Sequence, residues 1–98
     1  MRYKVEFRDS VRSYLRNLPL SRNGRVRLNA ALISLVAEVT DSFRSDPQNR
    51  CGASSLYYHL TQVFQDDGTL LTLYIVVDDS TAAYGVLRII YADCQGDR

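Results

Sequence analysis

Residues 56–91 read LYYHLTQVFQDDGTLLTLYIVVDDSTAAYGVLRIIY, and this stretch decides the fold. Segments rich in apolar, aromatic and β-branched residues at 56–64, 70–77 and 83–91 alternate with turn-forming residues, DDG at 66–68 and DDS at 78–80. Connections this short impose antiparallel pairing, because a parallel return needs a crossover of about a dozen residues. The stretch therefore predicts a three-stranded antiparallel meander, which needs a covering layer to be stable.

The first half of the chain predicts that cover. Residues 3–7, YKVEF, alternate apolar and charged side chains, which indicates a strand with its apolar residues toward the core. A helical stripe follows at 11–18. Asp9 or Ser10 is placed to cap this helix, and Pro19 is placed to end it.

A second, longer helix is predicted at 24–43, where leucine, valine and phenylalanine recur at helical spacing. A polar loop at 46–54 leads into the meander, and a polar tail at 93–98 follows it. Residues 1–98 are thus predicted to form one α+β domain of order β-α-α-β-β-β. In this domain a helical hairpin packs on a mainly antiparallel four-stranded sheet.

The composition is that of an ordinary globular protein, with 46% hydrophobic and 23% charged residues. No apolar run approaches the ~20 residues of a membrane span, and the first residues have no apolar segment typical of a secretory signal. One histidine and two separated cysteines, Cys51 and Cys94, cannot supply a zinc ligand set. These observations predict a cytoplasmic protein without a metal, a cofactor or a membrane partner.

Charge is divided unevenly along the chain. Residues 1–50 contain ten Lys and Arg against five Asp and Glu, whereas residues 51–98 contain two against six. Arg22, Arg25 and Arg27 lie at the start of the second predicted helix, where positive side chains oppose the helix dipole. This placement favours an anionic partner, and the alternative is a solvated basic helix face without a function.

Four polar side chains are predicted on the sheet face opposite to the core. His59 is the only imidazole, and it is either a general base or an exposed strand histidine without a catalytic role. Arg88 interrupts an apolar strand, so it either binds a phosphate or pairs with Glu6 or an aspartate. Lys4 and Glu6 would join His59 and Arg88 in one polar patch, unless they only face solvent.

Two further features indicate a partner. The predicted sheet is apolar on both faces in places, at 75–77 and at 86–90, and such strands must be covered on both sides. The second cover would be a segment of another protein or a second copy of this chain. Four tyrosines outside the predicted core are also available to stack on single-stranded bases: Tyr57, Tyr74, Tyr84 and Tyr91.

The order of elements, the length, the opening strand YKVEF and the final strand YGVLRIIYA resemble the RelE/ParE superfamily of toxins from type II toxin–antitoxin modules. The resemblance covers nearly the whole chain, including the L-P sequence at 18–19. It implies a RelE-like fold, a cognate antitoxin as the partner protein and one of two activities. RelE-like members bind in the ribosomal A site and cleave messenger RNA, whereas ParE-like members inhibit DNA gyrase.

For a RelE-like ribonuclease, the resemblance implies roles for particular residues. Arg88 lies where ribonuclease members often carry an arginine that contacts the scissile phosphate, and Tyr91 lies near the family's functional C-terminal tyrosine or histidine. His59 and Tyr91 would then handle protons or stack on bases. Lys4 and Arg50 would be auxiliary cations that bind RNA.

On the middle strand, the family's Tyr-Arg-x-x-Tyr pattern is reduced to Tyr74, because Leu71 occupies the arginine position. Two interpretations therefore stay open. One is a metal-independent endoribonuclease that acts on mRNA at the ribosome. The other is a non-catalytic interaction module on the same fold: a gyrase-directed toxin, a degenerate toxin or a homodimeric binding protein. A basic cleft containing Arg88 and His59 would favour the enzyme, and an apolar or acidic face would favour the module.

Overall fold

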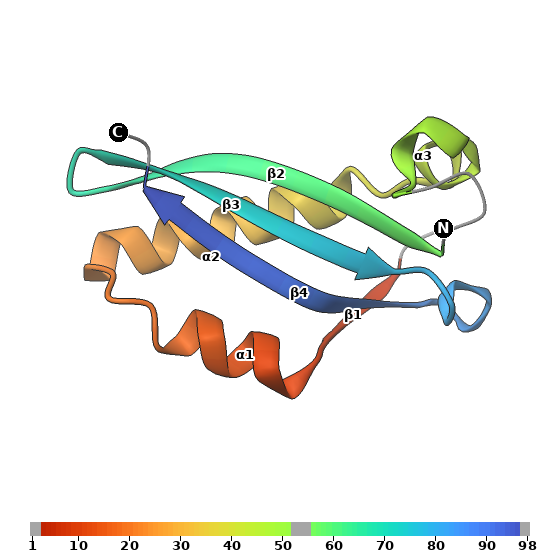
Figure 1. Ribbon diagram of the computed structural model, residues 1–98, viewed down its shortest axis with the longest axis horizontal. Helices are drawn as coiled ribbons and strands as arrows, with labels where there is room; N and C mark the ends of the chain where they lie inside the picture. The colour runs from red at the N-terminus through yellow and green to blue at the C-terminus, as the bar shows by residue number, and fades with distance from the viewer. Residues whose placement is uncertain (1–2, 52–55, 97–98) are drawn as a thin grey trace.

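The computed structural model describes residues 3–51 and 56–96, in which helices cover one face of a four-stranded sheet (Figure 1). Strand β1 pairs parallel with β4, and the other neighbours pair antiparallel, so the sheet is mixed. The predicted α+β class and the antiparallel meander are confirmed. In the order in which they lie across the sheet, the strands are β1 (Lys4–Phe7), β4 (Val86–Gly96), β3 (Thr69–Asp78) and β2 (Tyr57–Asp66).

The hairpin of β2 and β3 closes at the predicted turn. Asp66 pairs with Thr69, which leaves Asp67 and Gly68 as the turn residues, with φ angles of 48° and 83°. Positive φ at both central positions is the mark of a type I′ turn, whose twist matches that of the two strands. Beyond this turn, alternate residues of β2 are buried against the helices: Tyr58, Leu60 and Phe64.

Strand β4 differs from its prediction at both ends. It begins at Val86, because residues 82–84 form a 3-10 turn, η2 (Ala82–Tyr84). It ends at Gly96, which pairs with Leu71, so the prediction of a polar tail from residue 93 is wrong over the part that the structure describes. The length of β3 explains why β4 continues past residue 93, since the β3 backbone offers hydrogen-bond partners to β4 almost up to the β2–β3 turn.

A β-bulge interrupts the pairing of β3 with β4. Val77 pairs with Ile89 and Val76 with Tyr91, which leaves Ile90 as an extra residue. A bulge shifts the alternation of side chains by one position. Ile90 therefore lies beside the start of the first helix, and the open sheet face carries less apolar surface than the sequence predicts.

Helices α1 (Asp9–Arg16) and α2 (Arg22–Ala37) form the predicted hairpin behind the sheet (Figure 1). The predicted cap of α1 at Asp9 or Ser10 is wrong, because the helix already includes both residues and follows Arg8 without a side-chain cap. The core between helices and sheet contains the largest fully buried side chains: Leu35, Tyr58, Leu73, Ile75, Leu87 and Ile89.

The helix predicted at 24–43 is divided in two. Helix α2 ends at Ala37, and α3 (Asp41–Ser45) begins after Thr40, whose hydroxyl accepts a hydrogen bond from the Phe43 amide at 3.1 Å. A threonine side chain that binds the backbone in this way starts a new helix and competes with continuation of the old one. Phe43 still packs against Tyr58, with 5.6 Å between ring centroids. The predicted loop that follows contains a short 3-10 helix, η1 (Pro47–Asn49), and residues 52–54 of that prediction lie outside the described part of the chain.

The start of α2 binds an anion from its own chain. Asp66, at the end of β2, accepts hydrogen bonds from the Ser21 amide at 3.2 Å and from the Ser21 hydroxyl. The same hydroxyl accepts a bond from the Gly24 amide at 3.0 Å and thereby caps the helix. The Asp66 carboxylate lies where the helix dipole favours negative charge, so it supplies the anionic group that the arginine-rich start of α2 favours.

Two of the three arginines near this start join neighbouring elements. Arg25 donates to the carbonyl oxygens of Leu15 and Arg16, at the end of α1, at 3.1 and 2.7 Å. Arg27 donates to the side-chain oxygen of Gln65 at 3.2 Å. These contacts hold the helical hairpin and the tip of the β2–β3 hairpin together.

Candidate functional site

One face of the sheet is covered by the helices (Figure 1), and the opposite face carries most of the predicted site residues. The strand register assigns Lys4 and Glu6 of β1 to this open face, because the neighbouring Val5 and Phe7 pack against the core. His59 lies on the same face, between the buried Tyr58 and Leu60 of β2. The face runs across all four strands and has no helix of the described chain over it.

Three aromatic side chains form a row across this face. The rings of His59 and Tyr74 lie 5.8 Å apart, and the rings of Tyr74 and Tyr91 lie 6.1 Å apart. The three residues come from β2, β3 and β4, and Val76 pairs with both His59 and Tyr91. Side chains on adjacent strands meet in this way because strands are only about 4.8 Å apart. The row is a continuous aromatic surface open to solvent.

The β-bulge brings Tyr91 to this face. Arg88 and Tyr91 are exposed, whereas Ile89 and Ala92 are buried on the other side. Strict alternation would place residues an odd number of positions apart on opposite faces. The extra residue, Ile90, reverses that parity, so Arg88 and Tyr91 share one face.

Arg88 is bound to a carboxylate. Its Nη2 lies 3.6 Å from the Glu6 side-chain oxygen, and both side chains are about half exposed, at 46% and 44%. On its other side, Arg88 pairs in register with Asp78 of β3. The sequence left two interpretations of Arg88 open, phosphate binding or an ion pair with a carboxylate, and the structure shows the ion pair with Glu6. Because exposed pairs of this kind contribute only ~0–1 kcal/mol, a phosphate can compete with Glu6 for the guanidinium.

Next to the aromatic row lies a shallow hollow of about 360 Å³. Tyr74 and Tyr91 line this hollow. The charged residue in its lining is a carboxylate, Asp93, whereas a phosphate site would have a cation there. Thr61, Thr72 and Gln95 complete the lining. The open face thus combines aromatic rings and two cations with carboxylates, and it is not a uniformly basic cleft.

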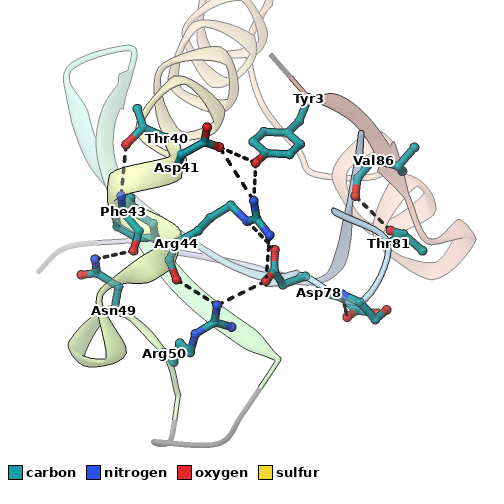
Figure 2. A network of polar contacts seen from close by, with 12 residues as sticks. Tyr3, Thr40, Asp41, Phe43, Arg44, Asn49, Arg50, Asp78, Thr81 and Val86 are labelled. Carbon is teal, nitrogen blue, oxygen red and sulfur yellow. Dashed lines mark hydrogen bonds and ion pairs between the residues drawn. The ribbon is translucent and has the colours of Figure 1, made fainter. Parts of the chain in front are cut away.

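Arg50 lies elsewhere, in a network of charges near α3 (Figure 2). Its guanidinium is 4.8 Å from the ring centroid of Tyr58, which belongs to the helix-covered face, and it donates to the Arg44 carbonyl at 2.8 Å. It also lies 3.3 Å from the Asp79 carboxylate. The structure therefore separates Arg50 from His59, Arg88, Tyr91 and Lys4, which it brings to one face.

Asp79 is the centre of this network. It is 8% exposed, and Arg44 donates from Nε to its Oδ1 at 2.8 Å. Arg44 also donates to the Tyr3 hydroxyl, which in turn donates to Asp41 at 2.6 Å (Figure 2). Burial raises the pKa of Tyr58, whose hydroxyl faces the same carboxylate. A buried carboxylate held by two guanidinium groups is a structural clamp, which joins the β3–β4 connection to α3.

Tyr74 is a residue of the candidate site that the sequence does not place among the catalytic or RNA-binding residues. The sequence offers it only as a tyrosine available to stack and as the remainder of the family's middle-strand pattern, whereas in the structure its ring contacts both His59 and Tyr91. The period of two in β3 carries the signal, because Tyr74 lies between the buried Leu73 and Ile75.

Within residues 3–51 and 56–96, no group of three His, Cys, Asp or Glu side chains is arranged to hold a metal ion. Cys51 and Cys94 are not joined by a disulfide, and burial raises the pKa of the Cys94 thiol. In the same part of the chain, no helix has the length and apolar character needed to cross a membrane. Comparisons with protein-family models, with curated proteins and with solved structures found no match to this chain.

Proposed function

We propose that the open sheet face binds single-stranded RNA, and that the chain is a RelE/ParE-like toxin with a cognate antitoxin as its partner. The observation that carries this proposal is the row of His59, Tyr74 and Tyr91 on an uncovered sheet face. Aromatic rings on an open sheet are a common platform for unstacked RNA bases. The order of elements, with a helical hairpin behind the sheet, supports the assignment to this superfamily.

The same face suggests how RNA cleavage would proceed at the ribosome. The ribose 2′-hydroxyl attacks the neighbouring phosphate, the 5′-oxygen of the next nucleotide leaves, and a cyclic phosphate results. Arg88, released from Glu6, would stabilise the charge that develops on the phosphate, and Lys4 would add a second cation. His59 and Tyr91 would accept and donate the protons or stack on the flanking bases.

A second candidate function is a non-catalytic interaction module on the same fold. Carboxylates on the open face favour it, because Glu6 occupies Arg88 and Asp93 lines the hollow beside Tyr91. Such a face binds a protein partner, as in a gyrase-directed toxin, with less charge repulsion than it binds RNA.

RNA binding is tested with a labelled single-stranded RNA and fluorescence polarisation. We expect Tyr91→Ala to weaken binding about tenfold, since one stacked base contributes about 1–3 kcal/mol. Arg88→Ala should weaken binding by about the same factor, because it removes the cation that would bind the phosphate. Glu6→Gln should strengthen binding, because it removes the carboxylate that competes for Arg88. The control is Tyr84→Ala, because the structure places this tyrosine, which is 85% exposed, in η2 of the β3–β4 connection and not in the row of His59, Tyr74 and Tyr91. Equal affinity in all variants would exclude the open face as the RNA site.

Toxin activity is tested by inducing the wild-type chain and Arg88→Ala in a bacterial host, with primer extension on a translated message. We expect growth arrest and new cleavage sites, both lost in the variant. Arrest without cleavage would favour gyrase or another target and the interaction module. No arrest from soluble, folded protein would exclude an active toxin.

A further inference from the structure

Helix α2 has two apolar faces. The inner face, with Leu28, Leu32 and Leu35, is buried against the sheet. The outer face carries a second stripe, Val26, Ala30, Ile33 and Ala37, at the spacing of one helix face. Val26 is 64% and Ile33 72% exposed, and all four residues of the stripe face solvent.

This outer stripe is unusual for a helix at a protein surface, where the outward face is normally polar. It is continuous over three turns, and shallow hollows border it on both sides. One hollow includes Ala30 and Val63, and the other includes Ile33 and Ala37. Apolar surface that is contiguous in this way marks an interaction site more often than scattered apolar residues do.

Charges around the stripe are divided between its two ends. Helix α2 has no acidic residue in its first turn and no basic residue in its last turn, whereas its dipole favours acidic residues at the start and basic residues at the end. Arg27 lies on one flank near the start, and Glu38 follows the helix at its end. The two residues are eleven positions apart, which is three helical turns, so they lie on the same flank of the stripe.

We propose that this stripe is the interface of a homodimer in which α2 packs antiparallel against α2 of a second copy. A two-fold axis near the middle of the stripe would set Val26 against Ala37 of the second copy, and Ala30 against its Ile33. Each large side chain then meets a small one, which allows the two helices to approach closely. Arg27 of each copy would meet Glu38 of the other, on the same side of the interface.

The charge pattern selects a second copy over other occupants. A purely acidic helix would match the arginine-rich start of α2 but would meet Glu38 with like charge at the other end. A purely basic helix would match Glu38 but would meet the arginine-rich start of α2 with like charge. An antiparallel copy matches both ends, and it also sets the two helix dipoles antiparallel. This interface lies on the far side of α2 from the sheet, so it leaves the open face accessible and does not depend on the function proposed for that face (Figure 1).

Sedimentation equilibrium tests the dimer. We expect the wild-type chain to be dimeric at micromolar concentrations and Ile33→Asp to be monomeric, with an unchanged circular dichroism spectrum because Ile33 is exposed. The matched control is Tyr84→Asp, which introduces the same charge at another exposed apolar residue and should leave the dimer intact.

A charge-reversal cycle tests the antiparallel arrangement. Arg27→Glu and Glu38→Arg should each weaken dimerisation about tenfold, because each variant sets like charges together at two symmetric contacts. The double variant should restore the wild-type dissociation constant. A wild-type chain that stays monomeric at hundreds of micromolar, or an Ile33→Asp variant that stays dimeric, overturns the proposal. Failure of the double variant to recover excludes the antiparallel register.

Discussion

Asp79→Asn is expected to lower the free energy of unfolding by about 3 kcal/mol at pH 7. Asparagine keeps the shape of the side chain but removes the charge that Arg44 and Arg50 share at 2.8 and 3.3 Å. Two partly buried guanidinium groups, 25% and 19% exposed, then lose a buried carboxylate partner, and removing one member of such a pair costs more than the pair contributed. Urea unfolding followed by circular dichroism measures the change.

The pH dependence of this loss has a defined sign. Burial by itself would raise the pKa of Asp79, but the hydrogen bonds from Arg44 and Arg50 and the charge of Arg44 lower it below its ordinary value. A carboxyl group with a lowered pKa adds stability above its unfolded-state pKa of about 3.9, and this contribution is lost as the pH falls further. The difference between wild type and Asp79→Asn should therefore be complete at neutral pH and decrease below about pH 4.

Asp67→Asn is the control for this experiment. It removes one charge at an exposed turn residue and should change the free energy of unfolding by less than about 0.5 kcal/mol. If Asp79→Asn has an equally small effect, or if its effect is constant as the solution is acidified, the network around Asp79 is not a charge-dependent clamp.

Gly24→Ala is expected to destabilise the protein, although alanine is the better helix former by about 1 kcal/mol. A Cβ atom on Gly24 would lie 2.7 Å from Cγ and 3.0 Å from Cβ of Asp66. These distances are too short, so the carboxylate must leave the start of α2 and give up its bonds to Ser21. We expect a net loss of about 1–2 kcal/mol, since a helix cap and a charge-assisted bond are both disturbed.

A double-mutant cycle with Asp66→Gly isolates this cause. In the absence of both the carboxylate and the Cβ of residue 66, the Cβ of residue 24 has room, and Gly24→Ala should become stabilising by up to about 1 kcal/mol. The change of sign, measured by thermal or urea unfolding, is the expected result. If Gly24→Ala destabilises both backgrounds equally, the close approach of Asp66 is not the reason for glycine at this position.

Local sequence was sufficient for the regular parts of the fold. The alternation in β2 predicts its buried face correctly, and the turn at Asp67-Gly68 sets the register of the whole hairpin. Element ends were less predictable. Helix α2 stops at Ala37 because the Thr40 side chain starts a new helix, and β4 continues to Gly96 because β3 supplies a partner. Neither competition can be judged from apolar spacing.

The open-face part of the candidate site was predictable from the sequence, whereas the position of Arg50 was not. His59, Arg88 and Lys4 follow from the period of two within their own strands, and the structure gives them one face. Arg50 does not join them, because a buried carboxylate 29 positions along the chain attracts its guanidinium. Such a partner cannot be identified from Arg50 and its neighbours alone.

By itself, the sequence of this protein determined the order of the main helices and strands and the open-face positions of Lys4, Glu6 and His59, because those properties depend on neighbours a few positions apart. Tertiary structure alone decided that Tyr91 shares a face with Arg88, through an extra residue at Ile90 that the pairing of β3 with β4 accommodates. It also decided that Asp66 binds the start of α2 and that Asp79 holds two arginines. These contacts join residues far apart in the chain, and they depend on how the elements pack.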